Sequence, residues 1–322
     1  MRHAIRRVLV FPVNGYLNRL QALASSAILA QQLDAPLLVC WTPFRMVPGP
    51  ASETFSSDWC QQFARTEAEI GITLDQVPLY VTHDLNLGVV RLRGHNLGEQ
   101  ALMGVLGDTL AGIHEPVDLV IVAGGSFDLT DPDATDGTWS EDFLAAKRDF
   151  YRALPLHPGI ESAASTAVAS HPEGFIGLHL RYSDRSHQAP MPRSIQRALE
   201  TQAEQSGVSS VFIASDTDRA REHWTARVKR MGLRPFDLSD SFASLAAATS
   251  AGPAMADWRV LGRSRRLVHF AESSYAVEAC VAAGSWRESS ALPTSSVRAL
   301  AHRGWTLGRA GVTYPSRHWG GR

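Results

Sequence analysis

The sequence contains little cysteine and no dominant sign of charge. Its 322 residues include three cysteines, Cys40, Cys60 and Cys280, which lie far apart. An odd number at this spacing forms neither a disulfide framework nor a zinc-binding pattern, and it fits a reducing compartment. Lys and Arg total 31 against 32 Asp and Glu, a net charge of −1. This balance gives no reason to expect nucleic acid or an anionic membrane as the main partner.

Long hydrophobic runs and the common nucleotide-binding signatures are also missing. After a basic start, the first apolar stretch covers only residues 8–13, too short for a signal peptide core or a membrane span. We therefore expect a cytoplasmic protein. The turn at residues 14–16, after this stretch, carries neither of the nucleotide-binding motifs GxGxxG and GxxxxGK[ST]. The acidic loop 128–136 lacks the spacing and the closing glutamate of a calcium loop, so no metal site is expected there.

What the sequence does contain is an alternation of strand and helix patterns in both halves. Apolar runs of strand type begin near residues 7, 36, 118, 175, 210 and 267, and helical periodicity follows most of them. Such alternation predicts mostly parallel sheets covered by helices, and the length suits two domains. We therefore predict an α/β protein of two domains with a cleft between them.

The first strand, over residues 7–13, leads into a tight turn before a helix over residues 17–33. Gly15 in this turn supplies a backbone conformation that other residues resist. A helix N-terminus beside such a turn offers free N–H groups and a partial positive charge, and so a place for an anion. Asn18 and Arg19 lie at the start of the helix. Two interpretations are open: Asn18 is a helix cap and Arg19 a surface residue, or both residues contact a ligand.

A polar tip after the strand at residues 175–178 is the most informative stretch. It carries His179, Arg181 and Asp184. His179 and Arg181 lie two residues apart, so on an extended backbone they point to the same face. The planar guanidinium group of Arg181 matches a phosphate two bonds at a time. Because carboxyl ends of strands line ligand crevices in open α/β sheets, this tip predicts the anion site of an enzyme with a phosphorylated donor.

Other polar positions allow more than one interpretation. His179 by itself is as typical of a hydrogen-bonded core histidine. Asp216 and Asp218 follow the strand at residues 210–214 and read either as a metal–nucleotide DxD motif or, for Asp218, as a helix cap. Glu272 ends a strand and reads as a base or a ribose contact. Four arginines are expected on a solvated helix face: Arg259, Arg263, Arg265 and Arg266.

Four stretches, in order, resemble one family. Residues 15–20 are similar to a Gly-x-x-Asn-Arg-Leu element, residues 179–184 to His-x-Arg-x-x-Asp, residues 212–216 to a strand ending in Ala-Thr-Asp, and residues 273–276 to Ser-Ser-Phe-Ser. This ordered set resembles the GDP-fucose fucosyltransferase superfamily, which includes α-1,6-fucosyltransferases, the nodulation fucosyltransferase and protein O-fucosyltransferases. The resemblance spans nearly the whole chain.

The resemblance implies a GT-B-like fold, in which two Rossmann-like domains face each other across a cleft. Residues 1–165 would form the acceptor-side domain, residues 166–303 the GDP-sugar-binding domain, and residues 304–322 an irregular tail. It also implies an inverting, metal-independent glycosyltransferase that needs no cofactor. L-fucose would pass from GDP-fucose, or another sugar from a related GDP-sugar, to a hydroxyl of a small-molecule or oligosaccharide acceptor.

The family's functional residues carry over to matching positions. Arg181 would bind the β-phosphate and stabilise the departing GDP, while His179 would contact the donor or orient Arg181. The remaining donor contacts implied by the resemblance are Asn18, Arg19, Asp216, Ser273 and Ser274.

The sequence also departs from the family pattern. Tyr182 stands where α-1,6-fucosyltransferases have a second arginine, residues 192–196 lack the expected acid, and Ala276 replaces a serine. Asp184 is the candidate general base, although a salt bridge to Arg185 or another cation is an equal reading. Two alternatives stay open: a metal-dependent nucleotide-sugar transferase using Asp216 and Asp218, and a nucleotide-sugar-binding protein without catalysis.

Overall fold

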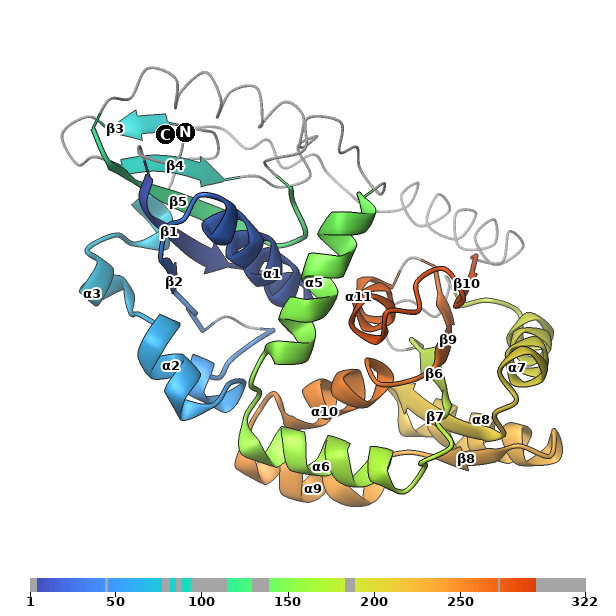
Figure 1. Ribbon diagram of the computed structural model, residues 1–322. Helices are drawn as coiled ribbons and strands as arrows, with labels where there is room; N and C mark the ends of the chain where they lie inside the picture. The colour runs from blue at the N-terminus through green and yellow to red at the C-terminus, as the bar shows by residue number, and fades with distance from the viewer. Residues whose placement is uncertain are drawn as a thin grey trace, which may run out of the picture.

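The computed structural model describes residues 5–43, 46–76, 82–84, 89–93, 115–128, 139–182, 189–271 and 273–293. These residues form two five-stranded sheets, each accompanied by helices (Figure 1). The α/β class predicted from the alternating pattern is confirmed. Within the described residues, no helix is both long and apolar enough to cross a membrane.

The first sheet has the strand order β2-β1-β5-β4-β3. Its neighbouring strands run parallel except for β3 and β4, which pair antiparallel. The strands are β1 (Ile5–Pro12), β2 (Leu37–Val39), β3 (Thr82–Asp84), β4 (Val89–Arg93) and β5 (Val117–Ala123). Residues 8–12 of β1 and 119–123 of β5 are buried and continuously apolar, as expected of parallel strands covered on both faces.

The second sheet has the order β10-β9-β6-β7-β8 and is parallel throughout. The chain starts in the centre with β6, moves outward through β7 and β8, and returns to the other side of β6 with β9. This reversal creates a switch point between β6 and β9, where doubly wound folds bind their ligands. The strands are β6 (Ile176–Leu180), β7 (Ser210–Ser215), β8 (Arg234–Phe236), β9 (Arg266–Phe270) and β10 (Ser290–Leu292).

Helices and short 3-10 turns connect the strands of both sheets. In the first half they are α1 (Tyr16–Gln32), η1 (Ala51–Glu53), α2 (Ser57–Phe63), α3 (Glu67–Ile70), η2 (Leu74–Gln76), α5 (Glu141–Ala153) and α6 (Pro158–Ala169). In the second half they are α7 (Pro192–Ser206), α8 (Asp218–Arg230), α9 (Ser239–Ala248), α10 (Gly252–Leu261) and α11 (Ser274–Ala283).

The two halves share a core. Helix α5 stands between α1 and α11, and α6 packs against α10 beside the second sheet (Figure 1). One apolar cluster contains Val10 from β1, Tyr151 from α5 and Trp258 from α10. Burial of these side chains therefore stabilises the contact between the halves as well as each sheet. The predicted domain boundaries stay predictions, and the predicted tail at residues 304–322 lies outside the described residues.

Three details differ from the sequence prediction around the second sheet. Arg263, Arg265 and Arg266 were expected on a helix face, but α10 begins at Gly252 and ends at Leu261. Residues 262–265 form the turn into β9. Helix α9 and strand β10 were not predicted, since their short patterns are weak. Thr217, not Asp218, caps α8: its hydroxyl accepts the backbone N–H of Ala220 at 3.4 Å.

The expectation that Arg259 lies on a solvated helix face is wrong. Its guanidinium group is buried and donates to the backbone carbonyls of Tyr151 at 2.6 Å and Leu154 at 3.1 Å. It also forms an ion pair with Glu161 at 2.6 Å. These carbonyls belong to the end of α5, where helices leave acceptors unpaired. Arg259 thus joins α5 and α6 to α10.

Candidate functional site

A cleft of about 650 Å³ lies between the two halves of the molecule. Residues 14–18, from the β1–α1 turn and the first turn of α1, line one side. The other side is lined by His179 and Arg181 at the end of β6, by residues 214–216 at the end of β7, and by residues of α10 and α11. Its volume is in the range that holds a nucleotide-sized ligand.

The turn on the first side has an unusual backbone at Asn14, not at Gly15. Asn14 has φ of 68°, whereas Gly15 has φ of −72° and ψ of 167°, which any residue adopts. The prediction that Gly15 supplies the special conformation is therefore wrong. Asn tolerates the left-handed region better than most residues, which explains its place here.

Asn18 and Arg19 both hold this turn, but only Asn18 is among the cleft-lining residues. The side-chain amide of Asn18 donates to the carbonyl of Gly124, after β5, at 3.0 Å. Arg19 is 1% exposed and donates through Nε to the carbonyl of Asn14 at 3.0 Å. Its guanidinium group lies 4.8 Å from the ring centre of Trp41, and burial lowers the pKa of Arg19 to about 10. In this conformation Arg19 supports the turn from behind.

On the opposite side, His179 is held as a neutral ring. It is buried, stacks on Tyr275 with ring centres 4.8 Å apart, and has Nδ1 3.4 Å from the Ser273 hydroxyl. Burial, reinforced by the nearby His269, lowers the pKa of His179 to about 3. The ring therefore acts as a hydrogen-bonding and stacking group near neutral pH and carries no charge.

Arg181 and Asp216 are brought together at the ends of adjacent strands. Both line the cleft, and one oxygen of Asp216 accepts the backbone N–H of Tyr182 at 2.8 Å. This bond fixes the backbone immediately after Arg181. The two candidate donor contacts thus lie at the same edge of the second sheet, and their roles stay predictions.

Ser273 and Ser274 occupy different places at the start of α11. Ser273 is buried, and its hydroxyl accepts the backbone N–H of Ala276 at 3.4 Å as the helix cap. Ser274 lines the cleft. The structure therefore brings Asn18, His179, Arg181, Asp216 and Ser274 to the cleft and keeps Arg19 and Ser273 behind its wall. Their roles toward a donor stay predictions.

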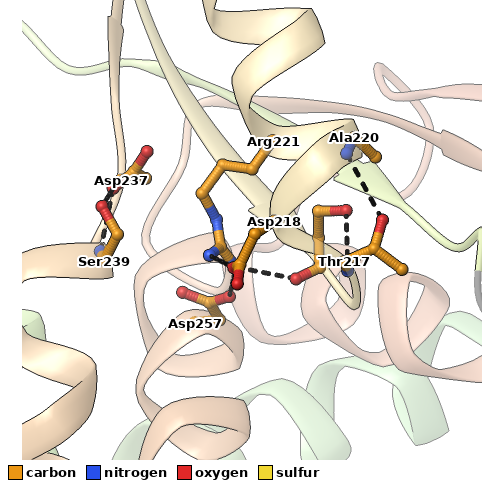
Figure 2. A network of polar contacts seen from close by, with 8 residues as sticks. Thr217, Asp218, Ala220, Arg221, Asp237, Ser239 and Asp257 are labelled. Carbon is orange, nitrogen blue, oxygen red and sulfur yellow. Dashed lines mark hydrogen bonds and ion pairs between the residues drawn. The ribbon is translucent and has the colours of Figure 1, made fainter.

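Asp257 on α10 is a cleft residue that the sequence analysis missed. Its side chain lines the cleft although the residue is only 6% exposed. Among the described residues, Oδ1 of Asp257 has no hydrogen-bond partner, while Oδ2 lies 3.8 Å from Arg221 (Figure 2). Burial raises the pKa of Asp257 to about 8. The available signal was an acid between Ala256 and Trp258, in a helix whose one other charged residue is Arg259.

The other acidic candidates stand apart from this arrangement. Asp218 forms an ion pair with Arg221 at 3.0 Å, and its side chain is 89% exposed, so it does not join Asp216 in the cleft wall. Within the described part of the chain, no three Asp, Glu, His or Cys side chains gather as metal ligands would. Asp184 and Glu272 lie outside the described residues, so their roles as a base stay predictions.

Comparison with solved structures finds the same fold in known proteins. Neither a protein-family model nor a curated protein sequence matches the chain. A solved FUT1 variant from Arabidopsis thaliana in complex with GDP matches with a TM-score of 0.58 and 15% identity, over 87% of this chain and 69% of that one. NodZ, an alpha-1,6-fucosyltransferase co-crystallised with GDP, matches with a TM-score of 0.50 and 15% sequence identity, over 85% of this chain and 91% of the NodZ chain.

The chain has the GT-B-like fold of fucosyltransferases. The predicted resemblance is confirmed at the level of the fold. At 15% identity the likeness extends no further, so the activity has to be argued from the cleft.

Proposed function

We propose that the protein is an inverting, metal-independent glycosyltransferase that moves L-fucose from GDP-fucose to a hydroxyl of a small molecule or oligosaccharide. The observation that carries this proposal is that one cleft holds both a cation and a buried carboxyl group. Arg181 offers a cation at the end of β6, beside the switch point, and Asp257 offers a buried carboxyl group from α10. A guanosine diphosphate is complementary to both.

The nucleobase would bind at Asp257. Guanine presents two neighbouring N–H donors, at N1 and at the 2-amino group, and an ionised carboxylate accepts two hydrogen bonds in that geometry. Oδ1 of Asp257 has no partner among the described residues and can accept one of them. Both matched structures contain GDP, which supports a guanine nucleotide here as well.

The diphosphate would bind at Arg181, opposite the first turn of α1. Its guanidinium group can donate two parallel bonds to phosphate oxygens, and the free N–H groups of residues 16–18 add a partial positive charge across the cleft. In the transfer step, the acceptor oxygen bonds to C1 of the sugar from the face opposite GDP. The bond from C1 to the β-phosphate oxygen breaks, and GDP leaves with the electron pair. Arg181 stabilises the charge that develops on that oxygen.

The proton of the acceptor hydroxyl goes to a base. Asp184 remains our candidate for it, three residues after Arg181 on the same strand-end segment. Asp216 is already engaged by the backbone N–H of Tyr182, and Asp257 is assigned to the nucleobase. The base is therefore sought in the segment that follows β6.

The test is release of GDP from GDP-fucose and from GDP-mannose, with a panel of hydroxyl acceptors and with EDTA. We expect turnover of GDP-fucose that survives EDTA. Arg181→Ala should lower kcat by about 10²–10³-fold, the usual cost of removing one preorganised donor, and Arg181→Lys should recover part of it. Strict dependence on manganese would favour the metal-dependent alternative. Tight GDP-fucose binding without any turnover would favour a binding protein, and either result contradicts the proposal.

A further inference from the structure

Arg221 lies behind the cleft wall, where Asp257 meets the end of β7. We propose that Arg221 is a positioning residue that stabilises the ionised form of Asp257 and thereby shifts the selectivity of the cleft from adenine toward guanine nucleotides. This inference rests on the proposed binding of a GDP-sugar, and it concerns how one side chain outside the cleft sets that selectivity.

The position of Arg221 is fixed from several directions (Figure 2). The side chain is buried, and Nη2 donates to the carbonyl of Ser215 at 2.7 Å. Nη1 donates to Asp218 Oδ1 at 3.0 Å, and the guanidinium carbon lies 4.5 Å from the ring centre of Phe242. With its plane held in this way, Nη2 stands 3.8 Å from Oδ2 of Asp257. This leaves Oδ1 of Asp257 for a ligand.

The other charged groups near Asp257 do not replace this cation. Asp237, in the turn before α9, raises the pKa of Asp257, as does burial, whereas Arg221 lowers it. Tyr275 on α11 is neutral, because burial and the charge of Asp257 raise its pKa well above the usual value. Helix α6, which also packs on α10, offers Glu161, and that carboxylate is bound to Arg259 and Arg263.

The cleft itself contributes three further polar groups toward this region. His179 at the end of β6 is uncharged near neutral pH, since burial lowers its pKa to about 3. Arg181 is the cation that the proposed function assigns to the diphosphate, and Asp216 is bound to the backbone N–H of Tyr182. Arg221 is therefore the described cation whose charge acts directly on Asp257.

The protonation state of Asp257 decides which purine edge it can recognise. An ionised carboxylate has two acceptors and fits the two donors of guanine at N1 and the 2-amino group. A protonated carboxyl group has one donor and one acceptor, which fits N1 and the 6-amino group of adenine instead. A cation that stabilises the ionised form thus favours guanine, and its removal shifts the preference toward adenine.

Guanine binding is coupled to loss of the proton from Asp257, so the affinity for GDP depends on pH. The pKa of Asp257 in the empty cleft is about 8, so guanine binding near pH 7 requires release of a proton. GDP affinity should rise about tenfold per pH unit below pH 8 and level above it, whereas ADP affinity should fall as pH rises. Without Arg221 the pKa of Asp257 lies higher, so GDP affinity should still be rising at pH 8.5.

The experiment is calorimetric titration of GDP and ADP between pH 6.0 and 8.5. It compares the wild type with Arg221→Leu, Arg221→Lys and the control Arg227→Leu. Arg227 lies on the same helix and has comparable contacts, with its guanidinium carbon 5.5 Å from the Trp224 ring centre and Nη2 2.8 Å from Gln196 Oε1. We expect Arg221→Leu to weaken GDP binding about tenfold or more at pH 7, with a smaller loss at pH 8.5. The GDP affinity of Arg221→Lys should lie between those of the wild type and Arg221→Leu, and that of Arg227→Leu should match the wild type.

Asp237→Asn provides a second variant that leaves Arg221 in place. Removing this negative charge should move the midpoint of the GDP affinity curve to lower pH, opposite to the shift in Arg221→Leu. If folded Arg221→Leu or Arg221→Lys keeps the wild-type midpoint and the wild-type GDP-to-ADP ratio, the inference is overturned. An unchanged midpoint in Asp237→Asn also overturns it, even if neither arginine variant folds. A wild type that binds no GDP instead refutes the proposed function.

Discussion

Two side chains in the cleft wall, His179 and Asp257, owe their protonation states to burial. Burial lowers the pKa of His179 to about 3 and raises that of Asp257 to about 8, so each favours its uncharged form near neutral pH. Such groups cost stability when they must become charged, and they are typical of functional sites. The cleft thus contains Arg181 as a cation and two groups whose charge depends on what binds beside them.

The substitution Asp257→Asn should change how the free energy of unfolding depends on pH. The pKa of Asp257 is about 8 in the folded protein against an ordinary value of 3.8, so the folded state holds a proton that the unfolded state releases between these values. Wild-type stability should therefore fall by about 1.4 kcal/mol per pH unit from this group between pH 5 and pH 8. In Asp257→Asn this pH-dependent decrease in the free energy of unfolding should be absent.

Urea denaturation of both proteins at pH 5, 6, 7 and 8 measures the difference. The free energy of unfolding of Asp257→Asn relative to wild type should rise steadily over this range, while its GDP binding weakens. Parallel pH curves for the two proteins would mean that Asp257 is ionised in the empty cleft, contrary to the present view.

At the scale of elements, a buried ion pair connects helices of both halves. Glu278 on α11 accepts from Lys147 on α5 at 2.8 Å, from Tyr151 at 2.6 Å and from Gln21 on α1 at 2.8 Å. Lys147 also donates to Ser126 at 2.7 Å. The first turns of α1 and α11 contribute residues to the cleft, so this network connects the two helices one turn or so behind the ligand site.

Removing one partner of this pair should be costly. Lys147→Met leaves the carboxylate of Glu278 buried without its cation, and we expect a loss of about 3–5 kcal/mol in the free energy of unfolding. The double variant Lys147→Met with Glu278→Leu should recover a large part, since neither charge then remains buried. Chemical denaturation at pH 7 measures both.

The matched control is an exposed pair between the same two halves. Arg287 and Glu141 are 2.5 Å apart, with side chains 68% and 56% exposed. Arg287→Ala should change the free energy of unfolding by no more than about 1 kcal/mol. Equal losses for the exposed and buried pairs would argue against the network described here.

Elements were predictable from sequence where one local pattern determined them. The apolar runs of β1, β5, β6, β7 and β9 need no tertiary information, because strands buried on both faces are apolar throughout. The polar tip after β6 was also recognisable from local sequence, because charged residues directly follow the apolar run. Ser140 precedes two acidic residues, a local pattern typical of a helix N-terminus, and its hydroxyl accepts the backbone N–H of Phe143 at 3.2 Å as the cap of α5.

Residues defined by distant neighbours were not predictable in this way. Arg259 reads as a surface residue until α5 and α6 are placed against α10. Asp257 reads as one polar position in a helix, and its significance depends on Arg221, 36 positions earlier in the sequence. The placement of Arg19 also depends on its neighbours, because Asn14 and Trp41 hold its guanidinium group behind the turn. Its role toward a donor stays a prediction.

At the scale of the whole molecule, two sheets place their strand ends at one cleft. In the second sheet the switch point lies between β6 and β9; in the first, β1 lies between β2 and β5, and its carboxyl end leads into residues 14–18. A shared apolar cluster and the Lys147–Glu278 pair hold the halves together. The cleft between them therefore has a defined shape before any donor binds.

Under the proposed function, this cleft binds a guanosine diphosphate through Arg181. The decisive experiment is calorimetry with GDP, UDP and ADP in the presence of EDTA, on wild type and Arg181→Ala. We expect GDP to bind wild type more tightly than UDP or ADP, and Arg181→Ala to lose about a hundredfold or more in affinity, as removal of two charge-assisted hydrogen bonds predicts. Absence of GDP binding, binding only with manganese, or an unchanged affinity in Arg181→Ala would contradict the claim.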